Sequence, residues 1–106
     1  MKVYVAGPMR GYADLNFPEF YRVANLLREV GHDVFNPAAG TGGEITEARL
    51  RKWMAQDLQW ICLHAEAIAL LDGWPESKGA CAERAAALAL GLKVAPYWDL
   101  LTGDCR

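Results

Sequence analysis

A single glutamate opens the most apolar segment of the chain. Glu83 is followed by Arg84 and then by residues 85–92, which carry no polar side chain. A helix that is apolar on every side is buried on every side, against its own sheet and against something else. Glu83 therefore either borders a cleft or is solvated beside Arg84, as most glutamates on helices are. In a cleft, its carboxylate is a candidate catalytic nucleophile.

A polar stretch, residues 72–79, precedes that segment. Asp72 directly follows a predicted buried strand, which puts an acid at the mouth of a cleft, although an Asp-Gly pair also forms ordinary turns. Trp74 could stack on a base or could simply anchor the loop. Ser77 and the amide of Gly79 fall at a helix N-terminus, where they either bind an anion or cap the helix.

The first loop of the chain, residues 7–11, is a third candidate. Its two glycines let the backbone around Pro8 and Met9 approach a ligand, and Arg10 can pair with a phosphate. The spacing is neither GxGxxG nor a P-loop, so the dinucleotide and NTPase interpretations fail. The alternative is an ordinary turn between a strand and a helix.

Three further polar residues have weaker cases. Asp57 interrupts a predicted helix and could face the cleft, but a surface position is favoured. His32 and His64 have no partner carboxylate at a useful spacing, so no Ser-His-Asp or Cys-His arrangement is predicted.

Four short apolar strands and three helices must position these residues. The predicted strands are 3–6, 33–36, 67–71 and 93–97, and the predicted helices are 16–30, 46–64 and 79–90, with a last helical turn over 98–101. Asn16 is the predicted N-cap of the first helix, with Pro18 and Glu19 behind it. Regular alternation predicts one α/β domain over residues 1–106, a three-layer sandwich around a parallel sheet of four or five strands. Ligands bind such sheets beyond the carboxyl ends of the strands.

Composition excludes several classes of function. A net charge of −2 without a basic run argues against binding a nucleic-acid polymer. No apolar run approaches the ~20 residues of a membrane span, and the N-terminus is not a signal peptide, so a cytoplasmic protein without a membrane partner is expected. Cys62, Cys81 and Cys105 form no metal framework. The first two are expected to be reduced and buried, Cys105 to be incidental, and no metal or cofactor is expected.

Five short motifs occur in an order that resembles a known superfamily. They are Tyr4-Val5-Ala6-Gly7-Pro8, Asn16-Phe17-Pro18, Asn36-Pro37, Leu71-Asp72-Gly73 and Gly79-Ala80-Cys81-Ala82-Glu83. Together they resemble the nucleoside 2-deoxyribosyltransferases, and most closely the small DUF4406-type branch, over nearly the whole chain. The resemblance implies a flavodoxin-like or Rossmann-like sheet. It also implies transfer of 2-deoxyribose between bases, or hydrolysis of the glycosidic bond of nucleotides.

The resemblance assigns roles to individual residues. Glu83 matches the nucleophile, Asp72 an acid that helps to position the substrate, and Tyr4 an aromatic residue beside the nucleophile. At an ordinary pKa of about 4.3, Glu83 would be ionised at neutral pH and able to form a covalent sugar ester at C1′. The acid that protonates the departing base is not identified. The predicted substrate-binding residues are Gly7, Pro8, Met9, Arg10, Asn16, Phe17, Trp74, Ser77 and Gly79.

Two other functions are compatible with the sequence. Superfamily members receive a C-terminal polar residue from a neighbouring subunit, and residues 100–106 offer no clear equivalent. The alternative is therefore a non-catalytic protein that binds or senses a nucleotide in the same cleft. The apolar segment 85–92 and the four tryptophans predict a homo-oligomer, and they also fit a structural or assembly role.

Overall fold

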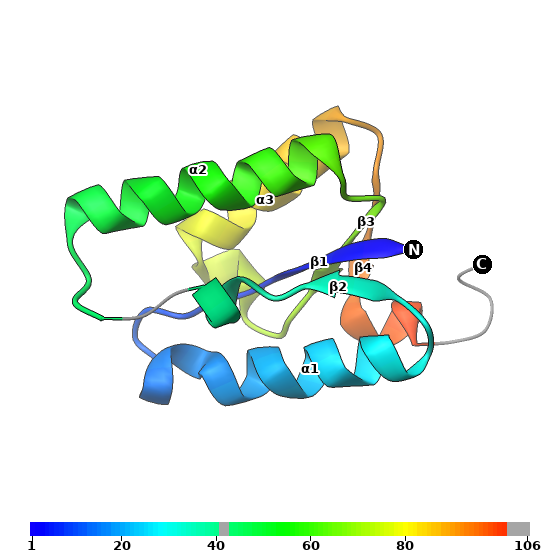
Figure 1. Ribbon diagram of the computed structural model, residues 1–106, viewed down its shortest axis with the longest axis horizontal. Helices are drawn as coiled ribbons and strands as arrows, with labels where there is room; N and C mark the ends of the chain where they lie inside the picture. Colours follow the sequence, from blue (N-terminus) through cyan, green and yellow to red (C-terminus); the bar gives the residue numbers. More distant parts are fainter. Residues whose placement is uncertain (41–42, 102–106) are drawn as a thin grey trace.

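Strands and helices alternate along the described chain. The computed structural model describes residues 1–40 and 43–101. The main elements are β1 (Lys2–Ala6), α1 (Phe17–Glu29), β2 (Asp33–Phe35), α2 (Glu47–Leu63), β3 (Ala67–Leu70), α3 (Lys78–Ala89) and β4 (Lys93–Pro96) (Figure 1). Four short 3-10 helices accompany them, η1 (Ala13–Asn16), η2 (Pro37–Gly40), η3 (Trp74–Glu76) and η4 (Tyr97–Leu100). Each predicted strand and helix is present, with ends that differ by no more than one residue.

The four strands form one parallel sheet in the order β2-β1-β3-β4. β1 is central, and its Tyr4 pairs with Phe35 of β2 on one side and Ile68 of β3 on the other. The predicted α/β fold is confirmed, with four strands and a flavodoxin-like architecture. The direction of winding reverses between β1 and β3, which is where such sheets bind ligands.

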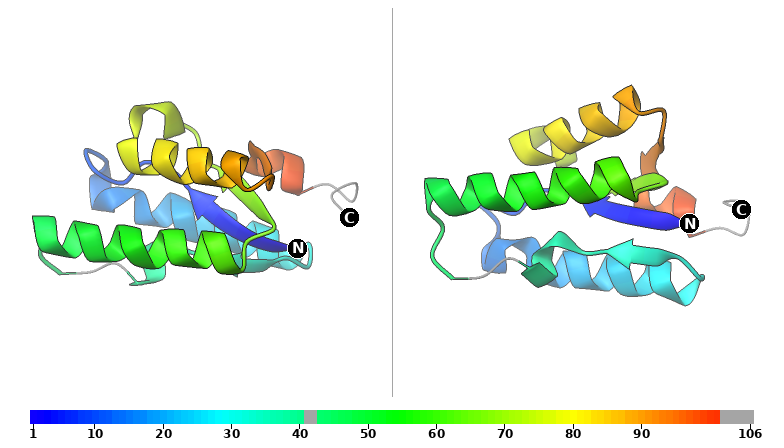
Figure 2. Two further views of the ribbon diagram at one scale, coloured as in Figure 1. Left: turned by 90° about the horizontal axis from the view of Figure 1, so that it is seen from above. Right: turned by 45° about the horizontal axis from the view of Figure 1, so that its top comes forward.

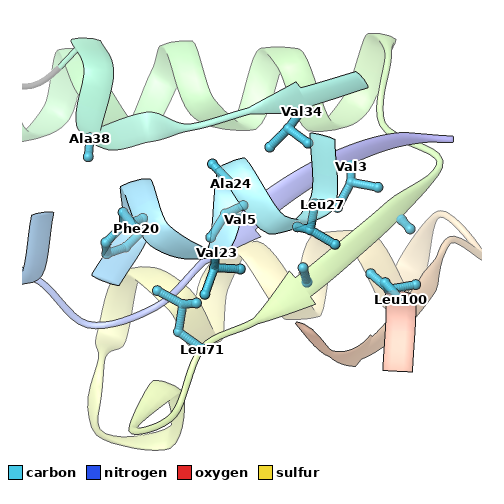
Figure 3. Close-up of a cluster of buried hydrophobic side chains, with 12 residues drawn as sticks. Val3, Val5, Phe20, Val23, Ala24, Leu27, Val34, Ala38, Leu71 and Leu100 are labelled. Carbon is cyan, nitrogen blue, oxygen red and sulfur yellow. The ribbon is translucent and has the colours of Figure 1, made fainter. Parts of the chain in front are cut away.

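The two faces of the sheet bury different side chains. α1 covers one face, and α2 and α3 lie side by side over the other (Figures 1 and 2). Because side chains alternate along a strand, Val3 and Val5 of β1 join the apolar cluster under α1, while Tyr4 and Ala6 join the cluster under α2 and α3. Figure 3 shows the first cluster, in which buried side chains of α1 such as Leu27 interdigitate with the strands. This alternation carries the Tyr4 hydroxyl to the α2/α3 face.

Side chains cap the starts of α2 and α3 but not that of α1. Thr46 Oγ1 accepts a hydrogen bond from the Arg49 amide at 3.2 Å, and Ser77 Oγ accepts one from the Ala80 amide at 3.1 Å. Asn16 occupies the predicted N-cap position of α1, but its backbone is left-handed at φ 61° and its side chain makes no capping bond.

The outer side of α3 is uncovered in the single chain. Leu88 is 50% exposed and Leu90 49% exposed, whereas Ala80 and Ala87 are buried against the sheet. The expectation that the segment 85–92 is buried on every side is therefore wrong for one chain, because only the inner stripe of the helix reaches the sheet.

The cysteines and the helices add two findings. Cys62 is exposed rather than buried because it lies on the outer side of α2, and Cys81 is partly buried. Cys105 lies outside the described residues. None of the helices in residues 1–40 and 43–101 is both long enough and apolar enough to span a membrane.

Candidate active site

A cavity of about 590 Å³ opens at the carboxyl ends of the strands. Most of its walls come from the segment after β1, from α2 and from the start of α3, with further contacts from β1, α1 and the residues after β2. They are lined by Tyr4, Gly7, Pro8, Met9, Arg10, Tyr12, Leu15, Phe20, Pro37, Ile45, Leu50, Trp53, Met54, Asp57, Glu76, Ser77, Lys78, Gly79, Ala80 and Glu83. The cavity thus lies at the edge of the sheet where the loops were expected to gather a ligand.

Glu83 lines this cavity and is held by Tyr4. The glutamate is 6% exposed, and Tyr4 is fully buried beneath it. The Tyr4 hydroxyl donates a 2.5 Å hydrogen bond to Glu83 Oε2. Of the two alternatives for Glu83, the structure therefore shows the position in a cleft.

A second carboxyl, that of Asp57 on α2, faces the same cavity and interacts with the same tyrosine hydroxyl. The favoured surface position for Asp57 is wrong, because α2 turns this side chain inward and leaves it partly buried. The sequence spacing around Asp57 indicates that it shares a helix face with two large apolar residues. Trp53 and Met54 precede Asp57 by four and three residues, so the three share one helix face, and all three line the cavity.

Burial changes the ionisation of the three groups. Burial raises the pKa of Glu83 to about 8; the hydrogen bond from Tyr4 opposes this shift, and the charge of Asp57 adds to it. Burial also raises the pKa of Asp57 to about 6, against the hydrogen bond with Tyr4. Burial and the two neighbouring carboxylates raise the pKa of Tyr4 well above its ordinary value, so its hydroxyl keeps its proton. The expected ordinary pKa of Glu83 is wrong, because the sequence does not reveal how deeply this side chain is buried.

The wall contributed by α2 and the loop before it is mostly apolar. Ile45, Leu50, Trp53 and Met54 form it, and the Arg49 guanidinium lies 5.4 Å from the centre of the Trp53 ring. An aromatic and aliphatic wall suits a planar heterocycle. The sequence had suggested only a packing or interface role for Trp53.

Most of the predicted binding residues are brought together at this cavity. The first loop contributes Gly7, Pro8, Met9 and Arg10, and the start of α3 contributes Ser77 and Gly79. Gly7 has a steric reason to be glycine, because a Cβ there would lie 2.7 Å from the Cβ of Leu71.

Four predicted residues do not line the cavity. Asp72 is exposed in the turn after β3, and the Trp74 ring packs against the Arg84 guanidinium, 4.8 Å from its centre. Phe17 packs into the apolar cluster on the α1 face. The Asn16 side chain binds the Pro8 carbonyl instead of facing the cavity. In each case the side chain points away from the cavity although cavity-lining residues lie near it in the chain.

Both cationic and anionic side chains line the cavity, and Glu76 lies beside Ser77 among the anionic ones. Arg10 and Lys78 line the cavity near Ser77 and Gly79. Within the described part of the chain, no three His, Cys, Asp or Glu side chains are grouped so that they could hold a metal ion.

Comparison with known proteins agrees with this architecture. Residues 1–96 match the family described as a domain of unknown function, DUF4406. The chain belongs to the DUF4406 family. No curated protein sequence matches it at a significant level.

A solved structure shares the fold of this DUF4406 domain. It is that of a 2-deoxyribosyltransferase from the psychrotolerant bacterium Bacillus psychrosaccharolyticus, described as a biocatalyst for the synthesis of nucleosides. The TM-score is 0.69 at 23% sequence identity, over 89% of this chain and 69% of the other. The resemblance predicted from the sequence is confirmed at the level of the family and the fold.

Proposed function

We propose that this protein cleaves the N-glycosidic bond of a nucleoside or a nucleoside 5′-monophosphate through a covalent intermediate on Glu83. The observation that carries the proposal is a pair of carboxyls, the buried Glu83 and the partly buried Asp57, which interact with the same Tyr4 hydroxyl in one cavity. Two carboxyls in different environments are what such chemistry requires, one as nucleophile and one as acid. The fold shared with a 2-deoxyribosyltransferase supports a nucleoside as the substrate class.

In the first step, an ionised Glu83 oxygen forms a bond to C1′ of the sugar. The bond from C1′ to the base nitrogen breaks, and its electron pair leaves with the base. Asp57 in its protonated form donates a proton to that base. Between about pH 6 and pH 8 the two carboxyls share one proton, which lies mostly on Glu83, so the reactive form is the minor one in which Asp57 holds this proton and Glu83 is ionised. The sequence left this proton donor unidentified, and Asp72, which was expected to help position the substrate, has an exposed side chain outside the cavity.

In the second step, water or a second base attacks C1′ and releases Glu83. Water gives hydrolysis and a base gives transfer, and either outcome retains the configuration at C1′ after two displacements. Tyr4 orients the Glu83 carboxylate through its hydrogen bond in both steps. The base would lie along the α2 wall against Trp53, so this residue takes the stacking role first considered for Trp74. Arg10, Ser77 and Lys78 would face the 5′ end of the sugar or its phosphate.

We also propose that the protein self-associates through the outer side of α3. Leu88 and Leu90 are each about half exposed there, beside an alanine-rich surface without charge. Sedimentation of the wild type and of Leu88→Glu tests this directly. An oligomer that the substitution dissociates is expected, and a monomeric wild type contradicts it.

The experiment for the enzymatic proposal is an assay for released base. The protein is incubated with a panel of nucleosides and their 5′-monophosphates, with and without a second base as acceptor. We expect release from at least one compound, and a loss of at least about 1,000-fold in Glu83→Gln. Glu29→Gln, which changes an exposed carboxyl on α1, is the matched control and should keep full activity. Tight binding without release would favour the alternative, a nucleotide binder or sensor.

A further inference from the structure

The segment between β1 and α1 has an unusual backbone beside the cavity. Asp14, Leu15 and Asn16 are three consecutive residues other than glycine in the left-handed region, with φ of 52°, 53° and 61°. Such residues normally occur singly, and a bulky side chain like that of Leu15 is rare there. Strained backbone persists only where surrounding contacts hold it, and it concentrates at functional sites.

One side chain ties this turn to the first loop. Asn16 Nδ2 donates a 2.9 Å hydrogen bond to the carbonyl oxygen of Pro8, eight residues earlier. Pro8 is buried and lines the cavity. The next two residues, Met9 and Arg10, also line the cavity but are less buried. The bond therefore closes a loop from Pro8 to Asn16, and the first residues of this loop form part of the cavity wall.

The far side of the same loop is also held closely. A Cβ on Gly73, in the turn after β3, would lie 2.5 Å from the Tyr12 hydroxyl and 3.3 Å from Pro8 Cγ. Pro8 is thus fixed between the β3 turn and the Asn16 amide. Inside the loop, the Tyr12 amide donates a 3.2 Å hydrogen bond to the Met9 carbonyl oxygen, and the Asn16 amide fixes this turn at its Pro8 end.

We propose that Asn16 is a positioning residue of this site. Its amide holds the Pro8 carbonyl, and through it keeps Met9 and Arg10 where a bound sugar or its phosphate would meet them. This role, which rests on the proposed function, acts on substrate binding and leaves the reacting carboxyls unchanged. It differs from the direct substrate contact expected from the sequence.

Three variants separate the bond from the backbone strain. Asn16→Asp keeps the size of the side chain and tolerates the left-handed backbone, but its carboxylate has no proton to donate. Asn16→Gly removes the bond and relaxes the same backbone position. Asp14→Gly relaxes the turn and leaves the bond intact, so it is the matched control.

The first measurement needs no substrate. Amide hydrogen exchange at Tyr12, whose amide donates to the Met9 carbonyl oxygen at 3.2 Å, should be about tenfold faster in Asn16→Asp and Asn16→Gly than in the wild type, as expected for the loss of one hydrogen bond. Asp14→Gly should match the wild type, and protection in α1 should be unchanged in all variants. Wild-type exchange in Asn16→Asp overturns the proposal.

The second measurement is the kinetics of base release from nucleoside 5′-monophosphates. Both Asn16 variants should raise KM about tenfold while kcat changes by less than about twofold. An unchanged KM, or an equal rise in Asp14→Gly, overturns the positioning role. A wild type that releases no base from any compound overturns the proposed function instead, and hydrogen exchange still decides whether Asn16 holds the loop.

Discussion

The two faces of the sheet are built from the same strands and serve different ends. Under α1, alternate strand residues such as Val3 and Val5 form a closed apolar cluster. On the α2/α3 side, the residue between them is Tyr4, which is as deeply buried but carries a hydroxyl between two carboxyls. One face therefore buries apolar side chains alone, and the other combines an apolar cluster with a cavity that holds ionisable groups.

The carboxyls on the α2/α3 face reduce the stability of the folded protein. A buried carboxyl is unfavourable unless it is partnered or protonated. Glu83 has one hydrogen bond from Tyr4, and burial still raises its pKa to about 8. The α1 face has no comparable group among its clustered side chains.

The largest effect expected on the α2/α3 face is the loss of the proton donor. Asp57→Asn keeps the shape of the side chain and cannot protonate the base, so kcat should fall by about 100- to 10,000-fold. Because burial raises the pKa of Asp57, the melting temperature of Asp57→Asn above pH 6 should be equal to or higher than that of the wild type, and steady-state kinetics with thermal melts measures both effects. Asp72→Asn, at the exposed acid, should stay close to the wild type. A larger loss in Asp72→Asn than in Asp57→Asn would restore the assignment made from the sequence.

The largest effect expected on the α1 face is on stability alone. Leu27→Ala opens a cavity in the closed cluster and should reduce the free energy of unfolding by about 2–5 kcal/mol. Chemical denaturation measures this change, with activity per folded molecule unchanged. The control is Leu88→Ala on the exposed side of α3, which should change monomer stability by no more than about 0.5 kcal/mol. Equal costs at the two positions would contradict the distinction between the faces.

Glu83→Gln, on the α2/α3 face, should increase the free energy of unfolding of the protein at alkaline pH. The folded protein keeps the Glu83 proton up to about pH 8, whereas the unfolded chain releases it near the ordinary pKa of 4.5. The contribution of this proton to stability is therefore present below pH 4.5 and is lost as the pH rises to 8. At about 1.4 kcal/mol for each unit of pKa, the glutamine variant should gain up to a few kcal/mol over the wild type at pH 9. Parallel unfolding curves from pH 5 to pH 9 for the two proteins would show that the carboxyl is not destabilised by burial.

The pH dependence of kcat/KM gives the smallest but most specific effect. Activity should rise as Glu83 and Asp57 release their first proton near the lower pKa of about 6, and fall as they release the second near the upper pKa of about 8. Below this range neither carboxyl is a nucleophile, and above it neither is an acid. The residual activity of Asp57→Asn should lack the alkaline limb. A profile that is flat from pH 5 to pH 9 would exclude both carboxyls from the reaction.

The fold was readable from the sequence because its signals are local. Short apolar runs ended by Gly or Pro gave the strands, and the alternation of strand and helix gave the parallel sheet. Glu83 was found for a similar reason, since a lone acid at the head of an apolar helix stands out in the sequence.

Other features of the site depend on tertiary geometry that the sequence does not display. Asp57 and Asp72 are both acids near cavity-lining residues, and only the packing of α2 decides which one turns inward. Asn16 has the residue type and spacing of a helix cap, yet its amide reaches a carbonyl across the loop. The shifted pKa of Glu83 follows from its burial against β1, whose Tyr4 lies 79 positions earlier in the chain.

The most direct measurement is a covalent trap for the nucleophile. A nucleoside with fluorine at C2′ slows the breakdown of a glycosyl ester, because fluorine withdraws electrons from the oxocarbenium-like transition state. After incubation with such a compound, mass spectrometry of the intact protein and its peptides should show one fluorosugar on Glu83, and none in Glu83→Gln. Base release by the wild type with an adduct on another residue, or an adduct that persists in Glu83→Gln, would contradict the account.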